Sequence, residues 1–151
     1  MFFARIWINA MAAAAIFVVS LSFQATAQSD VLGLWIPAEQ DSVIEIYSCG
    51  DEFCGRVIEL NQPVDEDGNP KVDRNNRDDA LRGRPILGME LLRGFKQEKP
   101  GSYRGGKIYN PRDGKLYKAV LTLMEDGTLK VRGYVGLPAL GQTQVWSRST
   151  D

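Results

Sequence analysis

The chain contains no histidine among its 151 residues. Histidine is the usual base that activates a serine or cysteine nucleophile, and it is the commonest protein ligand of metal ions. Its absence excludes most hydrolase mechanisms and all histidine-based metal centres. Any catalysis has to rest on carboxylates, tyrosine or lysine.

The chain also lacks an excess of charge of either sign. It has 18 lysine and arginine residues against 19 aspartate and glutamate residues, and a formal net charge of −1. Proteins that bind nucleic acid or anionic membranes usually carry a basic cluster, and none is visible here. We therefore expect no nucleic-acid partner and no electrostatic attraction to an anionic membrane surface.

Only one long apolar run is present, and it lies at the N-terminus. Arg5 precedes an apolar stretch from Ala10 to Val19 that continues through Phe23, and Ala25-Thr26-Ala27 supplies a small-residue cleavage pattern. This order predicts a cleaved signal peptide over residues 1–27 and one mature domain over residues 28–151. An uncleaved anchor is the alternative, although the run falls short of the roughly 20 residues that a membrane span needs.

The predicted signal peptide implies a periplasmic or secreted protein of a Gram-negative type bacterium, with no stable membrane anchor after cleavage. No cysteine stands directly after the apolar run, which argues against a lipid-anchored lipoprotein.

Cysteine is scarce as well: Cys49 and Cys54 are the only two. In an exported protein such a pair is expected to form a disulfide. The enclosed loop is so short that the bridge removes only about 2 kcal/mol of chain entropy, so it would pin a hairpin. Redox activity is the alternative, but it usually needs a two-residue spacing at the start of a helix.

All 15 glycines lie after residue 27, which favours many tight turns over long helices. Short runs with strand character recur between clusters of Gly, Asp, Asn and Pro. They predict eight strands: 34–36, 43–49, 54–60, 86–92, 103–109, 115–124, 128–135 and 143–148. Asn110 to Gly114 and Glu125 to Gly127 are expected to form hairpin turns. The fold class is therefore all-β, either a sandwich or an up-and-down barrel.

The polar segment from Asn61 to Pro85 is longer than an ordinary connection, which indicates a functional or a mobile loop. A short helix is expected from Asp78 to Arg82, with Asp78 or Asn76 as its cap. Asp65, Asp67 and Asn69 have the spacing of calcium ligands, but the calcium loop needs Gly and Glu where this sequence has Pro70 and Asn76. We expect no metal site and no cofactor.

Trp35 lies near the start of the mature domain and Arg148 near its end. In a closed antiparallel barrel the first and last strands are neighbours, so the guanidinium could lie across the indole in a cation–π contact. This pair is predicted to close one end of the barrel in a structural role.

Several motifs resemble a small family of exported bacterial proteins known as domain of unknown function 2147. They are Cys49 to Gly55, Asp73 to Asn76, Leu81 to Gly88, Gly105 to Pro111, Gly114 to Tyr117 and Arg132 to Gly136. The chain departs from the family pattern at Arg77, where Pro is expected, and at Tyr103, where Trp is usual. The resemblance implies a lipocalin-like barrel in the bacterial envelope, and it supplies no catalytic residues. Together with the eight predicted strands, it leads us to expect an eight-stranded antiparallel up-and-down barrel with one long polar loop that carries a short helix.

Strand alternation predicts which side chains face the interior. Tyr117, Ala119, Leu121 and Leu123 share one face of their strand. On the next strand Leu129, Val131, Gly133 and Val135 share the inward face, and Lys130, Arg132 and Tyr134 lie on the opposite face. Leu87, Met89 and Leu91 are expected to join the inward set. An eight-stranded barrel is just wide enough to hold one small ligand or to be filled by its own side chains. The candidate ligand-binding residues combine an expected wall with polar groups at a mouth: Leu87, Met89, Leu121, Arg84, Tyr109, Tyr117 and Arg132. Each also has a structural explanation, as a common strand or surface residue.

The sequence thus predicts a non-catalytic binding module for a small apolar or amphiphilic ligand. The alternative is a filled barrel that docks on another envelope protein through residues 61–85. A third hypothesis, an enzyme that uses Asp73 or Glu90 as acid and base, needs one of these carboxylates to face a cleft.

Overall fold

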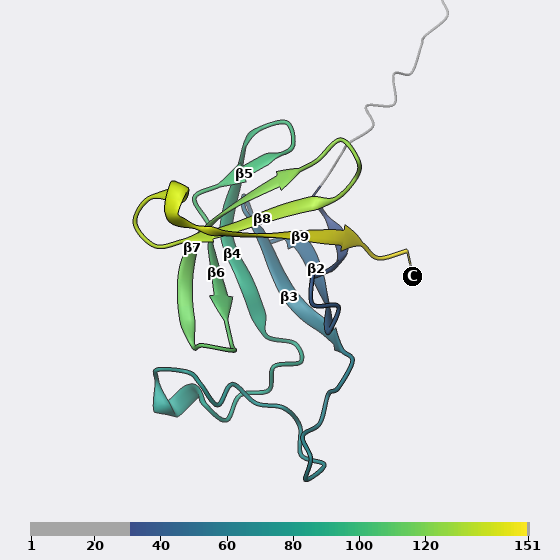
Figure 1. The fold of residues 1–151 in the computed structure, drawn as a ribbon, viewed down its shortest axis with the longest axis vertical. Helices are drawn as coiled ribbons and strands as arrows, with labels where there is room; N and C mark the ends of the chain where they lie inside the picture. Colours follow the sequence, from purple (N-terminus) through teal and green to yellow (C-terminus); the bar gives the residue numbers. More distant parts are fainter. Residues whose placement is uncertain (1–30, 151) are drawn as a thin grey trace, which may run out of the picture.

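The computed structural model describes residues 31–150, so the predicted signal peptide over residues 1–27 lies outside the described residues. The described chain forms nine strands and two short 3-10 helices (Figure 1). The strands are β1 (Gly33–Ile36), β2 (Ser42–Ser48), β3 (Phe53–Leu60), β4 (Glu90–Lys99), β5 (Ser102–Arg104), β6 (Lys107–Asn110), β7 (Lys115–Leu123), β8 (Leu129–Tyr134) and β9 (Gln142–Arg148). The 3-10 helices are η1 (Asp79–Leu81) and η2 (Pro138–Leu140).

The strands form a closed antiparallel barrel with eight positions. Neighbouring strands in the sheet follow the order β3-β2-β1-β9-β8-β7-β5-β4, and pairing between β3 and β4 closes the ring. β5 and β6 both pair with β4 and with β7, so together they occupy one position. The predicted eight-stranded up-and-down barrel is confirmed.

One predicted strand, 103–109, is divided into β5 and β6 by two glycines. Gly105 has a φ of 81°, which an L-residue rarely adopts. A Cβ at Gly106 would lie 2.4 Å from the ring of Phe95, so the missing side chain makes room for that buried aromatic. The strand is therefore interrupted at Gly105 and Gly106 because the ring of Phe95 packs against the backbone there.

The strand predicted at 86–92 instead begins at Glu90 and continues to Lys99. The amide of Met89 donates to the carbonyl of Ile86, and Gly88 has a φ of 83°, so residues 86–89 form a turn. The later part of β4, from Lys96 to Lys99, is exposed and pairs with β5, whose Ser102 and Tyr103 are buried.

A bulge in β4 changes which of its side chains face inward. Gly55 pairs with Leu92 and Phe53 pairs with Phe95, so two steps along β3 correspond to three along β4. Gly94, with a φ of 78°, accommodates the extra residue. As a result both Leu92 and Phe95 are fully buried.

One end of the barrel is filled by large side chains. Trp35 is fully buried, and the Arg148 guanidinium carbon lies 4.3 Å from the centroid of its ring. The two residues are paired directly across β1 and β9, as predicted. The Trp35 indole N–H donates to the carbonyl of Val31, and the amide of Val31 donates to the hydroxyl of Tyr103. These contacts close this end of the barrel.

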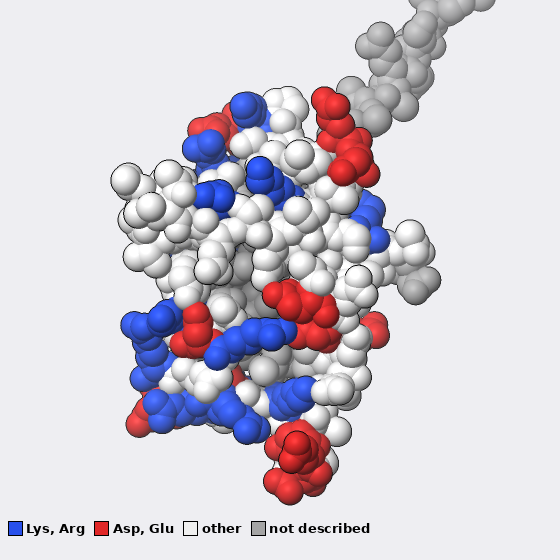
Figure 2. Space-filling view, in the orientation of Figure 1, with Lys and Arg blue, Asp and Glu red and all other residues white. Residues whose placement is uncertain are grey.

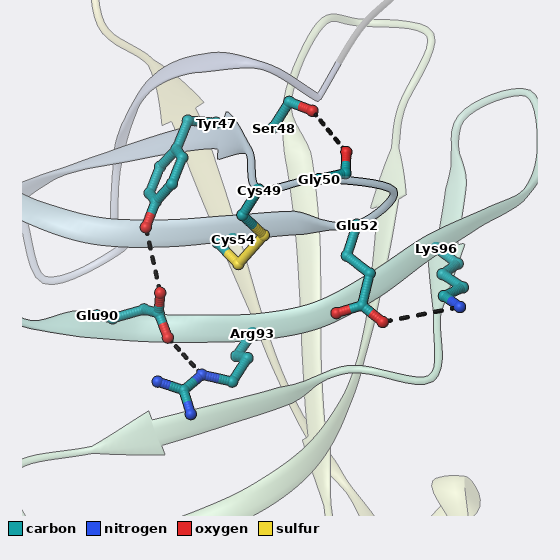
Figure 3. Close-up of a disulfide and its surroundings, with 9 residues drawn as sticks. All are labelled: Tyr47, Ser48, Cys49, Gly50, Glu52, Cys54, Glu90, Arg93 and Lys96. Carbon is teal, nitrogen blue, oxygen red and sulfur yellow. Dashed lines mark hydrogen bonds and ion pairs between the residues drawn. A yellow bond between two sulfur atoms is a disulfide. The ribbon is translucent and has the colours of Figure 1, made fainter.

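The predicted disulfide between Cys49 and Cys54 is present, with 5.9 Å between the two Cα atoms. It joins the end of β2 to the start of β3 on the outer face of the barrel (Figure 3). Beside it the Tyr47 hydroxyl donates to Glu90, which also pairs with Arg93. Burial, and then the hydrogen bond to Glu90, raise the pKa of Tyr47.

Candidate functional site

The interior of the barrel changes character from one end to the other. Along the inward face of β7, Leu121 and Ala119 are at most 1% exposed, whereas Tyr117 is only partly buried. Along β8, Leu129 is fully buried and Gly133 is partly exposed. Val135, which alternation places on the same inward face, lies beyond the end of β8 at Tyr134 and is 72% exposed, so its predicted inward position is wrong. The barrel is therefore packed at the Trp35 end and accessible to solvent at the other, which we call the open end. Figure 2 shows the surface hollowed on this side of the molecule, below β9.

The wall of the open end is formed by three neighbouring strands. Ile108 pairs directly with Tyr117 on the same inward face. A Cβ built on Gly133 would lie 3.6 Å from Ile108 Cγ2 and 3.7 Å from Tyr117 Cβ, so all three residues adjoin. Ala119 and Val131 lie deeper and are buried. The wall is thus apolar, with small residues at its centre.

Polar side chains surround this wall at the rim. The Arg112 guanidinium, in the β6–β7 turn, pairs with Asp41 in the β1–β2 loop at 2.5 Å. The Tyr117 hydroxyl donates to Asp113, and this hydrogen bond raises the pKa of Tyr117. The Gln144 amide donates to Glu39 at 2.8 Å. The rim therefore joins a cation, carboxylates and an amide around an apolar recess.

Of the three residues predicted to form an interior wall, Met89 and Leu121 are buried and Leu87 is not. Leu87 is 49% exposed, because it lies in the turn before β4 and outside the barrel, so the expectation that it faces inward is wrong. Met89 is buried, and Leu121 is fully buried in the packed core. Two surface hollows of about 240 and 430 Å³ are present in residues 31–150, and none of these three residues lines either.

Arg84 and Tyr109, which were expected at the mouth of a pocket, instead meet the buried carboxylate of Asp73. The carboxylate accepts from the Tyr109 hydroxyl at 2.7 Å, from the Asn76 amide at 2.7 Å and from the Arg84 Nε at 2.9 Å. Burial, and then the hydrogen bond to Asp73, raise the pKa of Tyr109. We call these four residues the Asp73 cluster; it fastens the long loop to β6.

The rest of the long loop is also ordered. Asp78 caps η1 by accepting from the amide of Ala80, close to the predicted short helix. Asp65 accepts from the backbone amides of Asp67 and Asn69, so this acidic group forms a turn. Within residues 31–150 no group of three side chains suited to a metal ion lies together.

Arg132 was also a candidate for the mouth of a pocket, but it lies on the outer face of β8. Its guanidinium donates to the carbonyls of Pro138 and Ala139 and to the Thr143 hydroxyl. It holds the β8–β9 loop in place.

Neither carboxylate proposed for catalysis faces a cleft. Asp73 is fully buried within its cluster, and Glu90 is held by Tyr47 and Arg93 on the outer face.

No helix within the described residues is long and apolar enough to span a membrane.

Sequence reasoning missed Ile108, Arg112 and Gln144 at the open end. Gln144 could have been found, since it lies two residues before the inward-facing Trp146. Arg112 could not, because its partner Asp41 is 71 residues away and only the closed barrel brings them together.

The comparisons with known proteins agree with this architecture. Residues 33–148 match the family described as "Uncharacterized protein conserved in bacteria (DUF2147)". Among solved structures the chain is similar to protein HP1028 from Helicobacter pylori, which is described as belonging to the lipocalin family. The two share 28% sequence identity over 81% of this chain and 84% of that chain, with a TM-score of 0.69. The search of curated proteins gave no match. The chain therefore belongs to the bacterial family DUF2147 and has the lipocalin-like barrel that its motifs implied.

Proposed function

We propose that the protein is an exported, non-catalytic module that binds one small apolar or amphiphilic molecule at the open end of its barrel. The observation that carries this proposal is the gradient of burial along the inward face. Leu121 and Leu129 are fully buried, whereas Tyr117, Gly133 and Ile108 face the same interior and remain partly exposed. Binding an apolar group there would remove this surface from water.

The chemistry of the open end favours an amphiphile. The apolar part of a ligand would contact Ile108 and the backbone of Gly133, where the absent side chain leaves space. Its polar end would lie near the rim, where Arg112 is 63% exposed although it is paired with Asp41. A carboxylate could replace Asp41 as the partner of this guanidinium with little change in charge.

Export to the periplasm is part of the proposal. It is supported by the disulfide, which is typical of oxidising compartments, and by membership of a bacterial family. Cleavage after Ala27 stays a prediction, and N-terminal analysis of protein isolated from the cell envelope tests it.

The experiment is competition against a fluorescent fatty-acid probe with the mature, disulfide-bonded protein. Gly133→Leu places a large side chain in the open end, whereas Gly133→Ala is the matched control because its Cβ would make only ordinary contacts at 3.6 Å or more. We expect wild type and Gly133→Ala to bind alike, and Gly133→Leu to bind at least about tenfold more weakly. Failure of the wild type to bind would overturn the proposal, as would full binding by a folded Gly133→Leu variant.

A filled barrel that docks on an envelope protein is the second candidate. It is favoured by the complete burial of Leu121 and by Val64 and Leu81, which are 46% and 40% exposed on the long loop. Native mass spectrometry of protein purified from the periplasm separates the two candidates. A retained small molecule supports the first, and a retained protein that is lost in a Val64→Ser, Leu81→Ser variant supports the second.

A further inference from the structure

The three most exposed large apolar side chains of the described residues lie on one loop. Val135, Leu137 and Leu140, in the β8–β9 loop, are 72%, 66% and 79% exposed. Such side chains contribute little to folding while they remain in water, and a group of them marks an interaction surface. We call residues 135–140 the apolar loop.

The apolar loop is held in one conformation. The Arg132 Nε donates to the carbonyl of Pro138 at 2.7 Å, and another nitrogen of the same guanidinium donates to the carbonyl of Ala139 at 3.0 Å. Gly141 then packs against β8, where a Cβ would lie 2.5 Å from the carbonyl oxygen of Gly133. The leucines are thus presented by an ordered backbone, so docking would not have to order the loop first.

A hollow of about 240 Å³ lies beside the apolar loop. It forms at the end of β8, where Tyr134 pairs with Lys118 and residues 115–117 of β7 extend beyond the last pair. Its lining includes Val135 as well as Lys107 and Lys118. The two lysines are paired across β6 and β7. Within residues 31–150 neither lysine takes part in any of the ion pairs that the structure shows. Two ammonium groups therefore flank the apolar loop without a neutralising carboxylate in that range.

The shape of this region decides which kind of partner it fits. In Figure 1 the β8–β9 loop stands out from the body of the barrel, and in Figure 2 it is an uncharged projection with basic side chains below it on the same edge. A projecting apolar tip can enter the headgroup layer of a membrane, whereas a protein partner would have to offer a matching recess. Adjacent ammonium groups would then meet lipid phosphates.

We propose that the apolar loop docks the protein reversibly on an anionic lipid membrane, with Leu137 and Leu140 in the interface and Lys107 and Lys118 against the headgroups. The proposal does not rest on ligand binding in the barrel, although Tyr117 belongs both to the open end and to the lining of this hollow. Interfacial binding combines the burial of apolar area with attraction to anionic lipids, and this region supplies both. The near-neutral charge of the whole chain limits the attraction to this edge and makes the docking reversible.

The test is co-sedimentation of the mature, disulfide-bonded protein with vesicles of phosphatidylcholine mixed with phosphatidylglycerol, compared with vesicles of phosphatidylcholine alone. We expect binding to the mixed vesicles that weakens at high salt. The Leu137→Ser, Leu140→Ser variant should bind at least about tenfold more weakly. The matched control is Val64→Ser, Leu87→Ser, because those side chains are 46% and 49% exposed on a different loop.

The charge contribution is tested separately. Each of Lys107→Gln and Lys118→Gln should weaken binding to the mixed vesicles by about fivefold. Lys99→Gln, at the far end of β4, should not. These substitutions are on the surface, and circular dichroism confirms that each variant is folded.

Three results would overturn the proposal. The wild type could fail to sediment with the mixed vesicles, or the Leu137→Ser, Leu140→Ser variant could bind as well as its control. Alternatively, the wild type could form a concentration-dependent dimer that this variant abolishes, and the apolar loop would then be a contact between two copies of the chain.

Discussion

Replacing Asp73 with alanine should release the long loop from the barrel. Its carboxylate is fully buried and accepts hydrogen bonds from Tyr109, Asn76 and Arg84. Loss of one member of a buried charged network costs about 3 to 5 kcal/mol. Two features reduce this cost: the Arg84 side chain is 38% exposed and can turn to water, and the Asn76 amide also donates to the Tyr109 hydroxyl. We therefore expect a loss of about 3 kcal/mol.

Amide hydrogen exchange measures this loss where it occurs. Protection of the backbone amides that hold the loop, such as those of Asp73, Asn76 and Ile86, should fall on the order of 100-fold in Asp73→Ala. Urea unfolding followed by tryptophan fluorescence reports the barrel, because Trp35 and Trp146 both lie in its core. The free energy of barrel unfolding measured by this fluorescence should fall by about 3 kcal/mol or less in Asp73→Ala, since the loop can open before the barrel unfolds.

The control is Asp67→Ala, an exposed carboxylate in the same loop whose loss should change stability by less than about 0.5 kcal/mol. Asp73→Asn should be intermediate, because it keeps one acceptor oxygen and loses the ion pair. If Asp73→Ala lowered both exchange protection and unfolding free energy by less than about 1 kcal/mol, the cluster would not hold the loop and the reasoning would be wrong.

Three further predictions concern the barrel. Replacing Cys49 and Cys54 by serine should lower the free energy of unfolding by about 2 kcal/mol in urea titrations, and reducing agent should no longer affect the variant. Arg148→Ala should lower it by about 1 to 2 kcal/mol through loss of the contact with Trp35, and unchanged thermal and urea midpoints would contradict this. The pKa of Tyr109 is raised above 10.0, so the protonated phenol stabilises the fold fully below pH 10 and this contribution is lost as the pH rises through the raised pKa. Urea midpoints measured upward from pH 10 should fall more steeply in wild type than in Tyr109→Phe.

The sequence was informative where one face of a regular strand is buried. On β7 and β8 the alternation of large apolar and polar residues identifies the inward face without ambiguity, because the side-chain period of a strand is two. Trp35 and Arg148 could be paired because closure makes the first and last strands neighbours. In both cases a local pattern and one topological rule were sufficient.

The errors lie where a glycine interrupts that period. Alternation through 87, 89 and 91 places Leu87 inside, but the turn ending at Met89 and the bulge at Gly94 bring Leu92 and Phe95 inward instead. A bulge is one extra residue on one strand, so it becomes visible only once the partner strand is known. Gly106 is similar, since its role depends on the ring of Phe95, which belongs to a neighbouring strand.

The candidate site was predicted least well because its polar members depend on partners far away in the sequence. Arg84 and Tyr109 were assigned to a ligand as polar groups beside an apolar wall. The structure gives them Asp73 instead, 11 and 36 residues away. A buried aspartate in a polar loop has no local signature, because nothing in its neighbours distinguishes it from an exposed one.

Arg132 shows how a residue can be placed correctly on a strand and still be given the wrong partner. Alternation assigns it to the face of β8 opposite the buried Val131, and it does lie there. Its partner is the backbone of the apolar loop. The exposed leucines of this loop cannot be recognised from the composition of the chain, because the loop is only a few residues long.

The net charge of the whole chain hides the neighbouring lysines in the same way, since 18 basic and 19 acidic residues cancel in the sum but not at each point of the surface. Binding depends on the charge within about one Debye length of the contact, roughly 8 to 10 Å at physiological ionic strength. The local arrangement of Lys107 and Lys118 around the hollow that Val135 also lines, rather than the net charge, therefore decides whether this edge attracts an anionic membrane.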